Sequence, residues 1–303
     1  MIASTLCCRA NFCPTNPIRD WRARLRYWRS ATMTIFELML GLGVGLALGL
    51  TGGGGMLAVP ALVVGLNYSM QDAMPVALIA ISIAAFMGAL DGLRRKIVRY
   101  KAAILMALAG IACAPAGIWF AQSVPLAVLV YLFASLLLCV SIRMAMQALA
   151  LRTGSNVSQQ LNKACQINPA TGRFYWCSKS VATFGGIGGV SGMLTGMLGV
   201  GGGFLIVPSL RQFSDLSINS TIATSLAVIA MVSAGTVTLV ISQGVVIPAT
   251  GVYFILSAIG GMLLARSLAS LMPEQYLQLA FALVAIVAAC MLIYDQLASA
   301  SGI

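Results

Sequence analysis

The chain has 303 residues, of which 60% are hydrophobic and only 8% are charged. Soluble globular domains carry about 25% charged residues, so this composition excludes a soluble protein with a water-facing surface. We therefore expect an all-α, polytopic membrane protein whose main surroundings are the lipid bilayer.

The net charge of +11 comes from basic clusters that separate apolar segments. Six arginines precede residue 30, five lysines and arginines lie within 94–101, and five more lie within 143–179. Clusters in these places follow the positive-inside rule and do not indicate nucleic-acid binding. The chain has no histidine and its eight cysteines form no CxxC pair, so neither a metal site nor a cofactor is expected.

Residues 1–32 form a basic N-terminal extension with one acidic residue, Asp20. They lack the apolar segment and the small-residue cleavage site of a secretory signal peptide. The composition fits an organellar transit peptide, or a misassigned start with translation beginning at Met33. The second interpretation is favoured.

Eight apolar segments follow the extension, and six of them have the length of about 20 residues that one membrane-spanning helix needs. The first segment has 34 residues. As one helix it would be about 50 Å long, against a hydrocarbon core of about 30 Å. The first and fifth segments are therefore expected to be interrupted. The segments are 33–66, 73–93, 100–120, 125–150, 181–212, 219–243, 247–268 and 274–297.

The interruptions are predicted at TGGGGMLAVP (Thr51–Pro60) and VGGGFLIVP (Val200–Pro208), because glycine and proline are the poorest helix formers. A helix that restarts after a break presents free N–H groups and the positive end of its dipole. We predict that the two restarts face one binding site, with Pro60 and Pro208 as helix-breaking prolines. The residues of this site are Thr51, Gly53, Gly54, Gly55, Gly201, Gly202 and Gly203.

Two hydroxyls after the second break, Thr224 and Ser225, either bind an oxyanion or hydrogen-bond to their own helix. Glu37 is the only candidate for a carboxylate that couples transport to a proton or cation, and a role at the helix terminus is favoured for it. Small residues at four-residue spacing pack membrane helices closely, and this is the expected role of Gly41, Gly45 and Gly49.

An internal repeat appears when the sequence is shifted by 148 residues. The shift places Gly53–Gly55 on Gly201–Gly203, Pro60 on Pro208, and Pro125 on Pro273. Three glycines and two prolines in one gapless register indicate a duplicated four-helix unit. An even number of crossings in each unit predicts parallel repeats related by an axis along the membrane normal. The expected organisation is repeat 1 at 33–150, a cytoplasmic linker at 151–180, repeat 2 at 181–297 and a tail at 298–303.

About eight transmembrane helices would place both termini in the cytoplasm, on the side of the basic clusters. Arg211 and Arg266 would then lie outside. The expected location is the bacterial inner (plasma) membrane.

The doubled GGG-x4-P element, each copy opening a four-helix repeat, resembles the sulfite exporter (TauE/SafE) family of membrane permeases. ATSL at Ala223–Leu226 and NPATGRFYW in the linker are similar to stretches of that family, and the resemblance covers about residues 35–297. Pro75–Leu78 departs from the pattern, because a small-Thr-Ser-Leu element would be expected there. The resemblance implies export of sulfite, sulfonates or related small organic anions.

These features predict a secondary transporter for small anions that works by alternating access between the two repeats. An anion channel of the same architecture and a non-transporting membrane scaffold are the alternatives. An enzyme is not expected, since the sequence offers no histidine, metal cluster or buried acid pair. The sequence leaves the coupling ion and the oligomeric state undefined.

Overall fold

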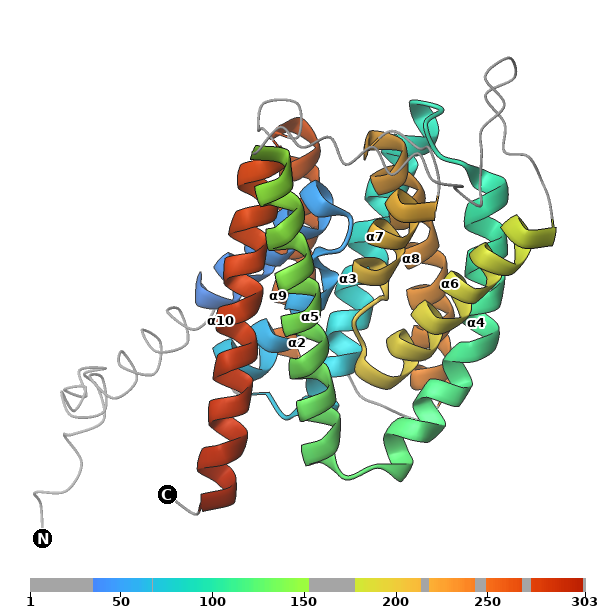
Figure 1. Cartoon of the computed structure of the whole chain (residues 1–303). Helices are drawn as coiled ribbons and strands as arrows, with labels where there is room; N and C mark the ends of the chain where they lie inside the picture. Colours follow the sequence, from blue (N-terminus) through green and yellow to red (C-terminus); the bar gives the residue numbers. More distant parts are fainter. Residues whose placement is uncertain are drawn as a thin grey trace, which may run out of the picture. The chain divides into compact units, whose positions relative to one another are not determined.

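The computed structural model describes residues 35–66, 68–152, 178–213, 218–242, 249–268 and 274–301. The chain divides into two compact units, Met1–Phe36 and Glu37–Ile303, and the fold below is that of the second. All regular structure in the described residues is helical (Figure 1), which confirms the all-α part of the predicted fold class.

Six helices in the described part of the chain are long and apolar enough to span a membrane, in place of the eight spans expected. Three shorter apolar helices accompany them: Ile35–Thr51, Gly54–Gly65 and Ala282–Tyr294. The segment after the first helix consists of three short turns, η1 (Gly54–Leu57), α2 (Ala58–Pro60) and η2 (Ala61–Gly65). The remaining helices are α3 (Met70–Arg94), α4 (Tyr100–Ser123), α5 (Leu126–Arg152), α6 (Ser178–Leu198), α7 (Gly203–Phe213), α8 (Ile218–Ser242), α9 (Ala249–Leu268) and α10 (Glu274–Ser301).

The bounds of α3 follow from its sequence. Ser69 caps the N-terminus, because its hydroxyl accepts a hydrogen bond from the N–H of Asp72 at 3.2 Å, as serine commonly does at this position. Near the C-terminus, the guanidinium of Arg95 donates to the carboxylate of Asp91 at 3.1 Å. The chain then turns at Lys96, whose φ of +58° is the only positive value at a non-glycine residue in the described part.

The first helix and the segment that follows it form a hairpin. A side chain at Gly54 would overlap the backbone of Ala47, and a side chain at Gly65 would overlap Leu40. Residue numbers therefore rise along the segment as they fall along the helix. The half-helix after the glycine run therefore turns back alongside the first helix, and α7 likewise contacts α6.

Helices α3 and α8, which the 148-residue shift relates, pack against each other in opposite directions. Near the middle of both, the hydroxyl of Ser82 donates to the carbonyl of its own equivalent, Ala230, at 3.5 Å. Beyond the end of α3, the carbonyl of Ile97 accepts from Ser220, close to the start of α8, at 2.7 Å. The related helices are therefore antiparallel, whereas parallel repeats were expected from an even number of crossings. The hairpin accounts for the difference, because the chain reverses direction at the first break, which the expected even number of crossings did not include.

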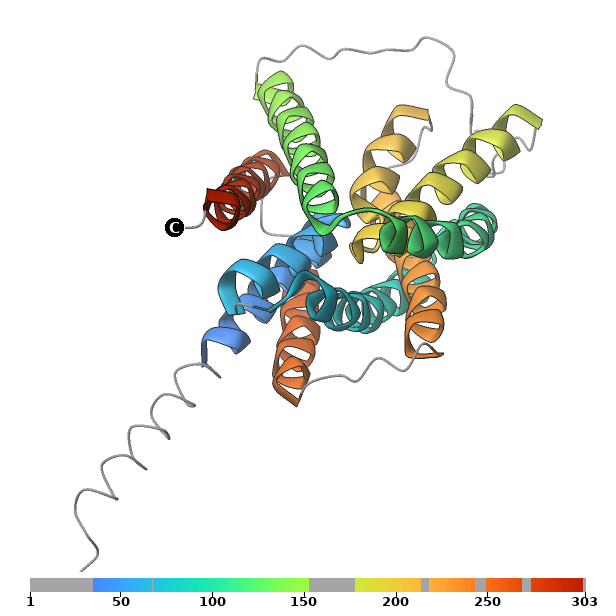
Figure 2. The same cartoon turned by 90° about the horizontal axis from the view of Figure 1, so that it is seen from below.

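The last helices of the two halves, α5 and α10, also lie in contact. Figure 1 shows α10 descending to its last residues beside α5, which rises from the α4–α5 turn. Seen along the helices, the two lie next to each other on one side of α3 and α8 (Figure 2). This second related pair is therefore antiparallel as well.

Each half contributes its first helix to the packing of the other half. Gly41, Gly45 and Gly49 of the first helix lie against α9, and Gly188, Gly192 and Gly196 of α6 lie in the same way against α4. A side chain at Gly45 would overlap the carbonyl of Ala258, and one at Gly192 would overlap the carbonyl of Gly110. The packing role expected for the first three glycines is confirmed, and the two halves interlock.

Gly192→Ile is expected to destabilise the protein, because the new side chain would meet backbone atoms of α4 that cannot rotate away. Overpacking of a close-packed site costs about 1–3 kcal/mol. Gly186→Ile on the same helix is the control, since no atom lies within 4 Å of its ideal Cβ position. Thermal melting of the detergent-solubilised protein measures the difference, and equal melting temperatures for the two variants would contradict the packing described.

Candidate functional site

Both helix breaks begin with the same glycine cap. The N–H of Gly52 donates to the carbonyl of Leu48 at 2.8 Å, and the N–H of Gly199 donates to the carbonyl of Thr195 at 2.9 Å. The two glycines have φ of +67° and +71°, a left-handed conformation that glycine adopts without the steric cost of a Cβ atom. The glycines, and not the prolines, therefore end the two helices.

The second break contains one residue more than the first. Gly52 and Gly199 are equivalent caps and differ by 147 positions, whereas Pro60 and Pro208 in the returning segments differ by 148 positions. Gly201 and Gly202, with φ of +75° and +64°, accommodate the extra residue. The packing glycines of the first helix and of α6 differ by 147 positions for the same reason.

The two breaks lie in direct contact. A Cβ atom built on Gly53 would lie 3.1 Å from the Cα of Phe204, and one built on Gly203 would lie 2.7 Å from the carbonyl oxygen of Gly52. A side chain at Gly203 would overlap the backbone of Gly52, and at Gly53 even a methyl group would be tight against the backbone of Phe204. The two glycine runs therefore form one compact centre.

This centre lies half-way along the two central spans. Gly55 packs on Ile81, near the midpoint of α3, and Gly203 packs on Ile229, near the midpoint of α8. All the glycines of the two runs are buried. Irregular backbone at the midplane between two repeats is the usual position of a transporter site.

The two hydroxyls predicted after the second break have different surroundings. Ser225 donates to the carbonyl of Ile222 at 2.8 Å and lies 3.4 Å from the carbonyl oxygen of Gly52, so it reaches the first break. The hydroxyl of Thr224 accepts from the backbone N–H of Arg99 at 3.1 Å and thus ties α8 to the α3–α4 loop. Only Ser225 of this pair belongs to the centre.

Thr51 stabilises the C-terminal end of the first helix through its side-chain hydroxyl. Its hydroxyl donates to the carbonyl of Ala47 at 2.7 Å and accepts from the N–H of Gly53 at 3.2 Å. The side chain thereby satisfies one backbone donor of the break, and it is buried. Its hydrogen bonds hold the turn in place.

The prolines and Glu37 lie away from the centre. Pro60 ends α2 and Pro208 lies inside α7, so both are in the returning segments, and their assignment as the helix-breaking residues is wrong. A proline has no N–H and leaves the carbonyl four residues earlier without its helical donor. Glu37 lies near the start of the first helix, about 20 Å before Thr51 at 1.5 Å per residue.

Three further hydroxyls surround the second break and were not anticipated. Ser191 donates to the carbonyl of Gly202 at 3.3 Å, and Thr195 donates to the carbonyl of Ser191 at 2.8 Å. Ser233 is fully buried, and its hydroxyl has no hydrogen-bond partner in the described structure. It lies 3.2 Å from the ideal Cβ position of Gly201. A buried polar group without a partner is rare and indicates a strained or functional position.

Sequence spacing contained a signal for these residues. Ser191 and Thr195 are four residues apart and precede the break, while Ser233 follows Ser225 by eight residues. Positions four and eight apart lie on one helix face. The equivalent residues of the first half are all apolar: Val44, Leu48 and Ala85.

The family description "Sulfite exporter TauE/SafE" matches residues 38–292, which is most of the chain. The chain belongs to the TauE/SafE family. Comparison with curated proteins gave no match, and comparison with solved structures gave none. The TauE/SafE assignment makes the chain a multi-pass membrane transporter and not an enzyme.

Ser233→Ala is expected to leave the melting temperature unchanged or higher, because no hydrogen bond is lost. Anion transport should fall if substrate uses this hydroxyl, by about tenfold for one hydrogen bond to a charged group. Ser141→Ala is the matched control, since Ser141 is equally buried and donates to the carbonyl of Leu137 in its own helix. Efflux from proteoliposomes is the measurement, and equal efflux in the two variants would exclude Ser233 from the site.

Proposed function

We propose that this TauE/SafE protein is a secondary transporter that exports sulfite, sulfonates or related small organic anions by alternating access. Its substrate site is made by the two glycine breaks, with Ser225 and Ser233 beside them. The observation that carries the proposal is the direct contact of the two breaks half-way along α3 and α8. Non-helical backbone at membrane depth occurs only where protein buries it or where it lines a watery cavity.

Glycine and hydroxyl groups suit an anion. Glycine allows an oxyanion to approach backbone N–H groups closely, and the start of a helix carries the positive end of its dipole. The α7 helix starts at Gly203, inside the centre. A coupling proton or cation remains part of the proposal, although Glu37 lies about 20 Å along the first helix from the break.

Close packing at the centre favours a transporter over a channel. Cγ2 atoms of Ile81 and Ile229 lie 2.9 and 3.2 Å from the ideal Cβ position of Gly201. A close-packed centre of this kind is what an alternating-access protein requires in its occluded state. A non-transporting scaffold would not need two buried helix breaks in contact with each other.

We propose further that the two halves are inverted repeats, related by an axis in the membrane plane. The antiparallel pairs α3–α8 and α5–α10 support this relation, as does the contact of Ser82 with its own equivalent. Because the first helix packs on α9 and α6 packs on α4, the bodies that move must each contain helices of both halves. Rocking of residues 33–150 against 181–297 would have to separate these contacts.

The basic residues support one orientation. Arg266 forms an ion pair with Asp91 at 3.0 Å, and Arg143 donates to the side chain of Gln212, so the ends of α3, α5, α7 and α9 lie on the side of the linker. In the described part of the chain, the lysines and arginines belong to this side. We propose that it is cytoplasmic, with the start of the first helix and the end of α10 on the opposite side. This replaces the expected cytoplasmic position of both termini.

Gly53→Ala tests the substrate site with little risk to folding. Its φ of −127° is open to alanine, and the added methyl group must shift Phe204 by only a few tenths of an ångström. The expected result is at least a severalfold loss of sulfite or sulfonate efflux from proteoliposomes with little change in melting temperature. Gly186→Ala on α6 is the control. Unchanged efflux in Gly53→Ala and in the bulkier Gly202→Val would remove the glycine centre from the site.

Reporter fusions test the inverted arrangement and the orientation together. Alkaline phosphatase, which is active only outside the cytoplasm, should be active when fused after residue 301 and inactive when inserted in the linker. An odd number of crossings in the second half requires this difference. Equal activity at the two sites would contradict inverted repeats, and the opposite pattern would reverse the orientation.

A further inference from the structure

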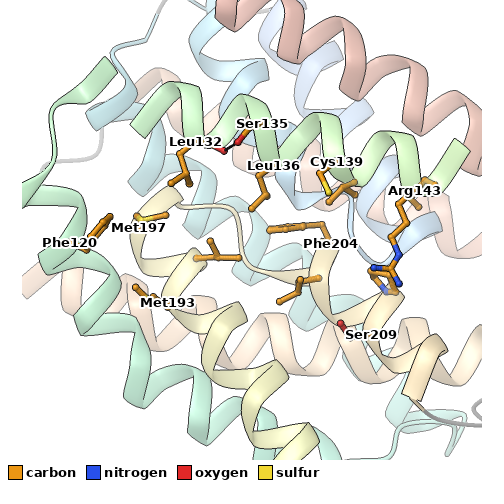
Figure 3. Close-up of a pocket in the computed structure, with 15 residues that line it drawn as sticks. Phe120, Leu132, Ser135, Leu136, Cys139, Arg143, Met193, Met197, Phe204 and Ser209 are labelled. Carbon is orange, nitrogen blue, oxygen red and sulfur yellow. Dashed lines mark hydrogen bonds between the residues drawn. The ribbon is translucent and has the colours of Figure 1, made fainter. Parts of the chain in front are cut away.

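A cavity of ≈ 580 Å³ lies between α5 on one side and α6 and α7 on the other, with the end of α4 at its edge (Figure 3). Its walls are mainly leucine, methionine, phenylalanine and valine side chains. Pockets of this size and composition bury organic ligands with an apolar body. A small, strongly hydrated oxyanion gains nothing from apolar walls, because transfer of a charge into apolar surroundings is costly.

Arg143 is the only charged residue among those that line the cavity. Its side chain lies at one end of the cavity in Figure 3 and donates a hydrogen bond to Gln212. A guanidinium is always protonated and can bind a sulfonate, carboxylate or phosphate through paired N–H donors. The cavity therefore combines an apolar body with a cationic end.

The charged end of this cavity has no counterpart in the other half of the protein. The residue equivalent to Arg143 under the 148-residue shift is Met291 on α10. The guanidinium of Arg143 is therefore a feature of the first half that the duplicated unit does not share.

The cavity also adjoins the second break. Phe204 follows Gly203 directly, its Cα lies against Gly53, and its ring lies in the cavity between Met197 and Arg143. A ligand in the cavity would touch the first side chain after the glycine run. The cavity is therefore placed to deliver an anion from the linker side to the glycine centre.

We propose that the cavity is a capture site for amphipathic organic anions, with Arg143 binding the anionic group and the walls of α5, α6 and α7 holding the hydrocarbon body. The transport role of the site rests on the function proposed above, whereas binding itself does not. Substrates with an apolar body are thereby preferred over sulfite. An anionic lipid shares this chemistry, and the experiment separates the two sources.

Cys139 lines the cavity and is exposed, so its thiol reports occupancy. The full chain, with every other cysteine replaced by alanine, is placed in phosphatidylcholine nanodiscs and labelled with N-ethylmaleimide. The probes are 1-octanesulfonate, methanesulfonate, which has the head group without the tail, and 1-octanol, which has the tail without the charge. Only 1-octanesulfonate is expected to slow labelling, by about tenfold when saturating.

Two matched controls accompany the measurement. A chain that keeps only Cys290, which is exposed on α10, should be labelled at the same rate with and without the probes. Arg143→Gln should raise the half-protecting concentration of 1-octanesulfonate about tenfold, as expected for loss of one charge-assisted contact. Lys101→Gln, which removes an exposed charge elsewhere on the same side, should leave it unchanged.

Three results would overturn the proposal. They are the absence of protection by 1-octanesulfonate, equal protection by 1-octanol, and protection that phosphatidylglycerol nanodiscs already provide without added sulfonate. The last result would identify a lipid as the occupant. Labelling does not depend on flux. The labelling experiment therefore tests the capture site even if the Gly53→Ala efflux experiment contradicts the proposed substrate site.

Discussion

A lipid bilayer offers no hydrogen-bond partners to a broken helix, and the whole arrangement depends on how the two glycine breaks meet this constraint. Each break is buried by the other, with Gly53 against Phe204 and Gly203 against the carbonyl of Gly52. Glycine is needed twice over. It permits the left-handed turns at Gly52 and Gly199, and it allows two backbones to approach without side chains between them.

The hairpins have consequences for the rest of the fold. Since the chain turns back after the break, the related helices α3 and α8 run in opposite directions. The first helix and α6 each pack on a helix of the other half through glycines at four-residue spacing. The halves are therefore joined along their length, and a conformational change must move helices of both halves together.

Chemical asymmetry is superimposed on this structural duplication. Ser191, Thr195 and Ser233 surround the second break, whereas the equivalent positions of the first half are apolar. Arg143 likewise has a methionine as its equivalent. A backbone framework shared by both halves thus carries different polar groups at its two breaks, which suits a single anion better than two equivalent sites.

The sequence by itself determined the membrane class and the positions of the breaks, and it predicted the duplication. These are local properties, because charge content, segment length against bilayer thickness and a gapless register need no three-dimensional information. The family resemblance carried by the doubled glycine element also holds over residues 38–292.

Only the tertiary structure shows the direction of the chain after each break and the contacts between residues distant in sequence. A glycine run shows that a helix ends but not which way the chain continues, and that direction sets the number of crossings and hence the relation of the halves. The 148-residue shift aligns the residues that follow the two breaks, whereas the helices before the breaks are related by 147 residues. The shift therefore does not reveal the single extra residue in the second break. Ser233 and Arg143 acquired their roles only from neighbours distant in sequence, Gly201 in one case and the walls of the α5–α7 cavity in the other.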